Sequence, residues 1–166
     1  MHNIMDDKFG GITKMLEEKI KSLGLTIPEP PEPVAAYVPA VKAGSMIYTS
    51  GQIPIVDGIL KYKGKIGLNL TEEEGYQAAK VCCINCLSVI KGEVDSLDEI
   101  EKIVKVTGYV NSAPGFTGQS KVINGVSDLL GEIFAESGEH ARAAIGVCEL
   151  PIDAAVEVEM LVKLKD

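Results

Sequence analysis

Arg142 is the residue whose type and setting best suit the binding of a charged ligand. It is the only arginine among the 16 basic residues of the chain, and it precedes the apolar segment 143–147. Lysine supplies every other cation, so solubility alone does not explain an arginine here. A guanidinium is a rigid, permanently charged fork that matches a carboxylate. Two interpretations stay open: a carboxylate ligand, or an internal salt bridge to one of the 24 acidic residues.

Glu157 is the second candidate, and it lies in an alternating segment near the end of the chain. Strand alternation places Glu157 and Glu159 on one face and Val156 and Val158 on the other. A carboxylate beside a cleft can position or deprotonate water. The alternative is a solvated strand face with no chemical role.

A predicted strand ends with small polar groups at Thr49, Ser50 and Gly51. A hydroxyl and a glycine amide at a strand end can bind an anion, although the same residues suit a plain strand terminus. Tyr37 has the same two interpretations, a packed edge aromatic or a site residue.

Three of the four cysteines, Cys82, Cys83 and Cys86, lie within five residues of one another. Cys82 and Cys86 would share one face of a helix. A zinc site usually needs four ligands, and Cys148 and His140 are weak partners. We therefore expect buried apolar cysteines and no metal. The sequence also contains no phosphate loop, dinucleotide fingerprint or Ser-His-Asp pattern.

Composition limits the class of protein. A chain of 166 residues suits one domain with its own core. The net charge of -8 argues against a broad nucleic-acid surface, which depends on lysine and arginine. The sequence has neither the roughly 18 apolar residues of a membrane helix nor the apolar core of a signal peptide. We therefore expect a cytoplasmic protein without membrane or nucleic-acid partners.

The N-terminal part of the chain differs from the rest. Helical spacing predicts a helix over residues 12–23, and the proline-rich segment 28–33 predicts an extended arm. We interpret residues 1–33 as an appended helix and arm, and residues 34–166 as the domain.

The remaining segments predict an α+β fold. Thr71 with Glu74 forms a capping-box pattern at a helix start. The predicted strands cover residues 34–43, 46–51, 102–110, 142–149 and 155–164, and the predicted helices cover residues 71–91 and 120–136. This order suits a two-layer mixed β-sheet backed by two helices. The uncovered face of such a sheet predicts oligomerisation.

Several segments together resemble the YjgF/RidA family. The carriers are residues 43–54, Asn124 in the second helix, residues 141–151 and residues 156–159. The family comprises reactive intermediate/imine deaminases, and its older labels are endoribonuclease L-PSP and translation initiation inhibitor. The match covers roughly residues 34–164.

The resemblance implies a chorismate-mutase-like fold, closed as a homotrimer with ligand clefts between subunits. It implies that Arg142 binds a carboxylate and that Glu157 holds the hydrolytic water. The implied substrate-binding residues are Tyr37, Ser50, Gly51, Asn124 and Ala144. Ala144 stands where the family usually has a small sulfur residue, and residues 36–40 also depart from its pattern. The chain therefore resembles a longer, divergent branch.

The function that this resemblance implies is hydrolysis of 2-imino or enamine acids to 2-keto acids and ammonia, without a cofactor. The partner would be a small carboxylate metabolite. The alternative is a non-catalytic trimeric binding module for small carboxylates or 2-keto acids. RNA cleavage or translation inhibition agrees less well with the acidic charge. The sequence names neither the ligand nor a role for the N-terminal helix.

Overall fold

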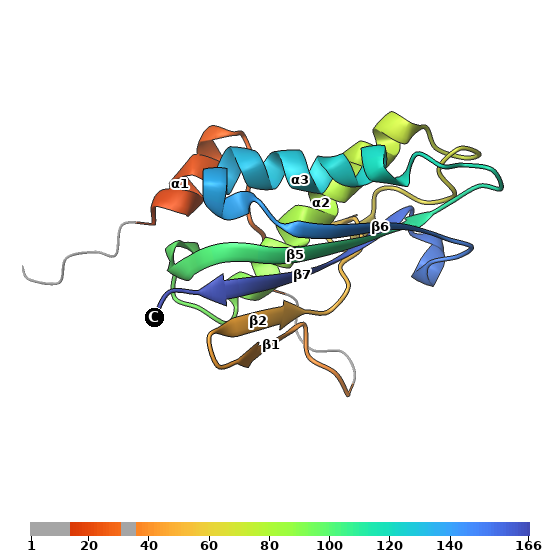
Figure 1. Cartoon of the computed structure of the whole chain (residues 1–166). Coiled ribbons are helices and arrows are strands. Elements are labelled where there is room, and N and C mark those ends of the chain that lie inside the picture. Colours follow the sequence, from red (N-terminus) through yellow and green to blue (C-terminus); the bar gives the residue numbers. More distant parts are fainter. Residues whose placement is uncertain (1–13, 31–35) are drawn as a thin grey trace, which may run out of the picture.

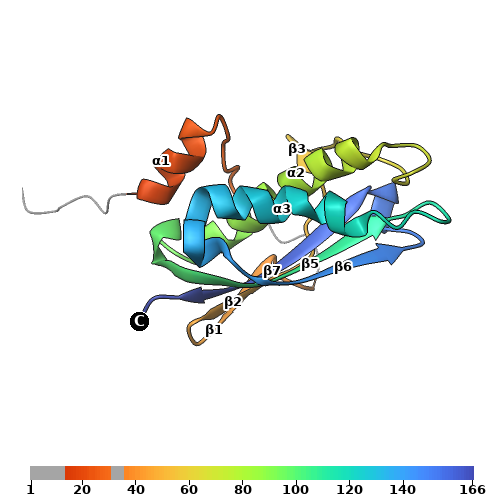
Figure 2. The same cartoon turned by 45° about the horizontal axis from the view of Figure 1, so that its top comes forward.

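A computed structural model describes residues 14–30 and 36–166 of the chain. Three α-helices lie on one side of a five-stranded sheet, so the fold has two layers (Figure 1, Figure 2). The helices are α1 (Met15–Ser22), α2 (Glu72–Lys91) and α3 (Gln119–Phe134). The sheet contains β1 (Ala40–Ala43), β2 (Met46–Thr49), β5 (Ile100–Asn111), β6 (Ala141–Val147) and β7 (Val156–Leu164). A small hairpin of β3 (Ile55–Val56) and β4 (Ile59–Leu60) stands apart from the sheet.

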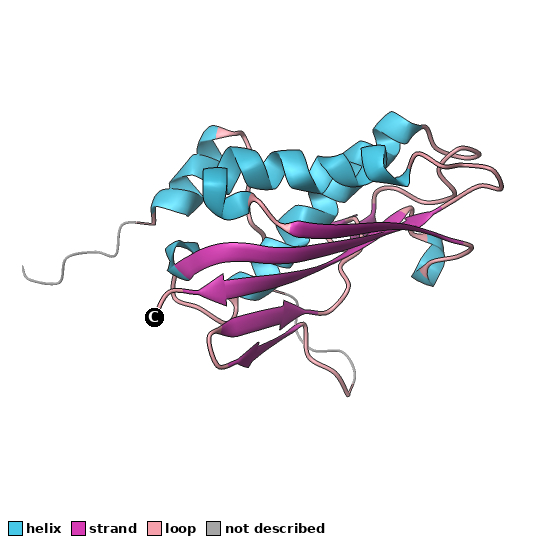
Figure 3. Ribbon diagram, viewed as in Figure 1, coloured by secondary structure: helices cyan, strands magenta, loops and turns pink. Residues whose placement is uncertain are grey.

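The sheet is mixed, with the strand order β1-β2-β7-β5-β6. β5 pairs parallel with β6 and antiparallel with β7, and α3 supplies the crossover that a parallel pair requires. β7, the last strand along the chain, lies between β2 and β5 (Figure 3). The two strands that carry Glu157 and Arg142 are therefore both neighbours of β5.

The longest helix, α2, starts where the sequence predicts. Thr71 accepts a hydrogen bond from the backbone of Glu74 at 3.1 Å, and the Glu74 carboxylate accepts one from the backbone of Thr71 at 2.7 Å. This reciprocal pair satisfies two backbone donors that the first turn leaves open. The predicted capping box is confirmed.

Helices α2 and α3 pack in close contact at Gly125. A Cβ at this position would lie 2.2 Å from the carbonyl oxygen of Tyr76, so only glycine permits the observed approach. Gly131, in the same helix, has no neighbouring atom within 4 Å of its would-be Cβ. Gly125 is therefore required for the packing of the two helices, whereas Gly131 is not.

Alternation along β7 gives the sheet two unlike faces. Val156, Val158 and Met160 are buried beneath the helices, whereas Glu157 and Glu159 project from the opposite face. That opposite face carries exposed apolar side chains: Val41 is 50% exposed, Tyr48 49% and Ile145 42%. An apolar sheet face without cover is typical of an interaction surface.

The main elements of the predicted α+β fold are confirmed, and the differences lie at the periphery. Residues 36–39 are not part of β1, and residues 34–35 of that predicted strand lie outside the described residues. The predicted layer of two helices contains a third, because α1 packs against α3 and Ile20 belongs to the core. The predicted boundary between residues 33 and 34 stays a prediction. Over the described residues, no helix is long and apolar enough to cross a membrane.

We predict opposite effects from two glycine substitutions in α3. Gly125→Ala should lower the free energy of unfolding by about 1–3 kcal/mol, because the added methyl group forces α2 and α3 apart. Gly131→Ala, the matched control, should raise it by about 0.5–1 kcal/mol, because alanine favours the helical backbone. Urea denaturation of both variants measures the two changes, and changes of the same sign would contradict this account of the packing.

Candidate functional site

Arg142 is the second residue of strand β6 and points toward α3. Its register partner in β5 is Val106, whose side chain is buried on the helix side of the sheet. The Nη1 atom of Arg142 donates to the Asn124 side-chain oxygen at 2.8 Å and to the Ser127 hydroxyl at 3.1 Å. Asn124 and Ser127 lie three residues apart on one face of α3. Helix α3 therefore orients the guanidinium through two neutral acceptors.

The charge of Arg142 is not neutralised within the described part of the chain. None of the ion pairs among these residues includes it, so the internal salt-bridge interpretation is wrong for residues 14–30 and 36–166. The side chain is exposed and lines a shallow cavity of about 390 Å³ together with Ser127 and His140. An exposed guanidinium with a free charge suits an anionic ligand.

Glu157 lines a second and larger cavity of about 570 Å³. Tyr37, Ser50 and Gly51 line the same cavity, so four of the predicted site residues lie together. A Cβ on Gly51 would lie 1.9 Å from the Glu157 Oε1 atom, which shows that this position must be glycine for the carboxylate to lie where it does. Gly51 follows β2, and Glu157 lies in β7. An isolated antiparallel β-bridge between their neighbours Gln52 and Val158 brings Gly51 and Glu157 side by side.

The setting of Glu157 favours its protonated form. Burial, and then the charge of Glu159 two residues along the strand, raise the pKa of Glu157 above its usual value. The Tyr109 hydroxyl donates to Glu159 at 3.3 Å, so Glu159 already has a partner within the chain. A carboxylate with a raised pKa can take up a proton from water more readily than an ordinary one.

The walls of the larger cavity are held by hydrogen bonds within the chain. The Ser50 hydroxyl donates to the carbonyl of Val38 at 2.7 Å. The Asn85 amide of α2 donates to the carbonyls of Ile53 and Ile55 at 2.9 and 3.0 Å. These bonds fix the segment that follows β2. The acidic residues that line the same cavity are Glu29, Asp57 and Glu157. Burial raises the pKa of Glu157.

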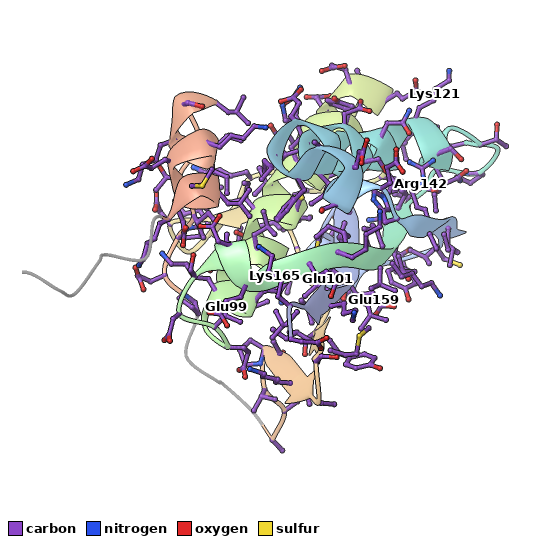
Figure 4. The ribbon with its side chains drawn as sticks, turned by 60° about the vertical axis from the view of Figure 1, so that its left-hand side comes forward. Glu99, Glu101, Lys121, Arg142, Glu159 and Lys165 are labelled. Carbon is purple, nitrogen blue, oxygen red and sulfur yellow. The ribbon has the colours of Figure 1, made fainter. Side chains whose placement is uncertain are left out.

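Arg142 and Glu157 lie on opposite faces of the sheet. Arg142 shares the helix side with Val106, whereas Glu157 pairs in register with Tyr109 on the open side. Figure 4 shows Arg142 beside α3 and Glu159, which shares the face of Glu157, on the other side of the strands. The two cavities have no lining residue in common. One chain therefore presents two separate parts of the predicted site.

The remaining predicted residues take structural positions. Asn124 contacts Arg142 directly, whereas Ala144 packs against the hydrophobic core. Sequence reasoning treated His140 only as a weak metal ligand and did not single out Ser127. Sequence spacing could have indicated both residues, because Ser127 lies three residues after Asn124 in a helix and His140 lies two residues before Arg142.

The cysteine cluster is buried, as predicted. The Cys82 and Cys86 thiols of α2 contact the carbonyls of Val156 and Val158 at 3.6 and 3.3 Å. Burial raises the pKa of Cys86 to about 12, so its thiol is protonated and unreactive at neutral pH. Among residues 14–30 and 36–166, no three cysteine, histidine or acidic side chains gather as metal ligands would.

Comparison with known proteins gives consistent matches. The model of the YjgF/chorismate mutase-like family, whose label also includes endoribonuclease, matches residues 17–164. Protein TCP17 of Trypanosoma cruzi is 40% identical over 148 residues, which cover 89% of this chain and 92% of TCP17. A 2-iminobutanoate/2-iminopropanoate deaminase of Dermatophagoides farinae is 27% identical over 141 residues, which cover 85% of this chain and 95% of the deaminase.

A solved structure agrees with the sequence matches. The crystal structure of Atu1372 from Agrobacterium tumefaciens superposes with a TM-score of 0.86 at 35% identity, covering 92% of this chain and 94% of Atu1372. The fold, the arrangement of the site segments and the extent of these matches lead to one conclusion: the chain belongs to the YjgF/chorismate mutase-like family.

Proposed function

We propose that this protein hydrolyses 2-imino and enamine acids to 2-keto acids and ammonia in a cleft between the subunits of a homotrimer. The observation that supports this most is the free charge of Arg142, which α3 orients without neutralising it. The similarity to a 2-iminobutanoate/2-iminopropanoate deaminase adds support for the reaction class.

In this proposal Arg142 binds the substrate carboxylate through the hydrogens of its guanidinium that remain free. Binding holds the C=N carbon near Glu157, which orients a water molecule and accepts its proton as the oxygen adds to that carbon. Protonation of the nitrogen and cleavage of the C–N bond release ammonia and leave the 2-keto acid. Imines hydrolyse readily, so positioning supplies most of the required acceleration.

The separation of the two cavities supports a site that is shared between copies of the chain. Arg142 and Glu157 line different cavities in one chain, so a complete cleft needs Arg142 of one copy beside Glu157 of another. The exposed apolar face of the sheet, with Val41, Tyr48 and Ile145, supplies a surface on which copies can meet. The two separate cavities and the exposed apolar face therefore support the proposed intersubunit cleft of a homotrimer.

Binding without turnover is the second candidate function. Tyr37 is 62% exposed in the single chain, and the Ser50 hydroxyl is already used by Val38, so neither is poised for catalysis there. A crystal soak with 2-ketobutyrate combined with a turnover assay separates the two functions. Occupied clefts without clearance of 2-iminobutanoate would select the binding module.

We predict that Arg142→Ala lowers kcat/KM for freshly generated 2-iminobutanoate on the order of 100-fold, because the substrate carboxylate loses its charged partner. Lys121→Ala is the matched control. It removes a cation of α3 that pairs with Glu72 at 3.4 Å, and it should change kcat/KM by less than about twofold. Wild-type clearance by Arg142→Ala would reject the assignment.

We predict that Glu157→Gln loses activity and gains stability. The wild-type kcat should fall as the pH falls through the raised pKa of Glu157, because only the carboxylate accepts a proton from water. Glu159→Gln is the control: it should retain activity and move this fall to lower pH, because it removes the neighbouring charge. A pH profile of kcat for the three proteins measures both effects.

The gain in stability follows from the same pKa. The folded chain holds the Glu157 proton more tightly than the unfolded chain, so wild-type stability decreases as the pH rises from 4.5 through the folded pKa. Glu157→Gln should therefore be the more stable protein at neutral pH, and the difference should shrink as the pH falls to 4.5. Urea denaturation at several pH values measures it, and a pH-independent difference would contradict the sign.

We predict that Ile145→Glu abolishes both assembly and clearance, because it introduces a charge into the apolar face of the sheet. Ile59→Glu is the control, since Ile59 is 58% exposed and lies on the small β3–β4 hairpin outside the sheet. Light scattering after gel filtration gives the mass of each variant. An active monomeric Ile145→Glu protein would reject the intersubunit cleft.

A further inference from the structure

We infer that Ser127 and His140 are positioning residues for Arg142, acting through a directed chain of hydrogen bonds that ends at the backbone of Gly138. This inference rests on the proposed role of Arg142 as the carboxylate-binding residue. It concerns how the protein sets the direction of the guanidinium before a ligand arrives.

The chain of hydrogen bonds has a fixed direction. The His140 Nδ1 atom lies 2.6 Å from the carbonyl oxygen of Gly138, and its Nε2 atom lies 3.0 Å from the Ser127 hydroxyl. A carbonyl oxygen only accepts, so Nδ1 carries the hydrogen. In the neutral ring, Nε2 must then accept, and the Ser127 hydroxyl donates to it. The oxygen of Ser127 is thereby left to accept from Arg142 Nη1, at 3.1 Å.

The end of this chain is rigid. Gly138 is buried against α3, and a Cβ at this position would lie 2.3 Å from the carbonyl oxygen of Leu130. The carbonyl group that sets the orientation of His140 is thus fixed by backbone packing. Both ring nitrogens of His140 have partners within the chain. His140 therefore acts on Arg142 through Ser127 and does not need to touch a ligand.

The hydrogen bonds also decide which edge of the guanidinium is available. Nη1 has two hydrogens, and its two acceptors are the Asn124 amide oxygen and the Ser127 hydroxyl. Nε and Nη2 donate to no acceptor among the described residues, so three of the five guanidinium hydrogens remain free. The Nε and Nη2 hydrogens lie side by side and match the two oxygens of one carboxylate. We therefore expect a side-on bidentate pair.

Such positioning has an energetic consequence for binding. An exposed arginine samples many rotamers, and ordering it on binding reduces affinity. Two neutral acceptors remove part of this freedom in advance without lowering the charge. Each hydrogen bond in a directed chain also polarises the next one, which strengthens the bond at Ser127.

Variants at Ser127 and His140 test the inference. Ser127→Ala and His140→Phe should each raise the Kd for 2-ketobutyrate about tenfold, measured by calorimetry. The KM for 2-iminobutanoate should rise similarly, with kcat within about twofold of wild type. The double variant should bind as weakly as either single variant, because both substitutions break one chain.

Two further variants are controls for the hydroxyl and for the helix. Ser127→Thr keeps the hydroxyl and should restore binding. Ser120→Ala changes an exposed serine of the same helix that takes no part in the chain of hydrogen bonds, and it should bind like wild type. Wild-type affinity in Ser127→Ala and His140→Phe, or additive losses in the double variant, would overturn the inference.

A readout without ligand separates this inference from the proposed function. Nitrogen-15 spectra of the imidazole groups should show His140 as the Nδ1–H tautomer, and the His140→Phe variant distinguishes its signals from those of His2. A Nε2–H tautomer would reject the chain of hydrogen bonds. Failure of the wild-type protein to bind 2-ketobutyrate or clear 2-iminobutanoate, with the Nδ1–H tautomer present, would instead reject the proposed function alone.

Discussion

The alternation of side chains across the central strands is the constraint on which the rest of the structure depends. Residues of β5, β6 and β7 that pair in register share a face of the sheet, so Arg142 joins Val106 on the helix side and Glu157 joins Tyr109 on the open side. A shift of one residue in any of these strands would exchange the two faces. The buried valines of β7 prevent such a shift, because it would expose them to water.

Within residues 14–30 and 36–166 Arg142 forms no ion pair, although the chain has 24 acidic residues. Glu157 and Glu159 project from the opposite face of the sheet, and α3 offers Arg142 only an amide oxygen and a hydroxyl. Glu139 lines the same shallow cavity as Arg142, yet the two side chains form no ion pair. A carboxylate within reach would form an ion pair and compete with any ligand. The fold thus preserves a free cation and a carboxylate in the same chain by placing a sheet between them.

The sequence predicted the elements with strong local signals and missed features that depend on contacts between distant segments. The Thr71–Glu74 capping box located the start of α2, and alternation placed Glu157 and Glu159 on one face. No local pattern shows that Gly138 abuts Leu130 or that His140 reaches Ser127, because these contacts join α3 to the segment before β6. The separation of the two cavities was likewise missed, because it depends on how β6 and β7 pair with β5.

The segment before β7 shows how the fold fixes the backbone of the strand that carries Glu157. Ile152 and Asp153 both have positive φ angles, of 51° and 63°, which cost energy for residues other than glycine. Asn111 holds this turn: its amide donates to the Asp153 side chain at 3.1 Å and to the Ala154 carbonyl at 3.2 Å, and its oxygen accepts from Lys65 at 2.9 Å. The buried network keeps a strained turn in place immediately before the strand that carries Glu157. Folding therefore supplies the energy that fixes the backbone just before Glu157, so a ligand would not have to order it.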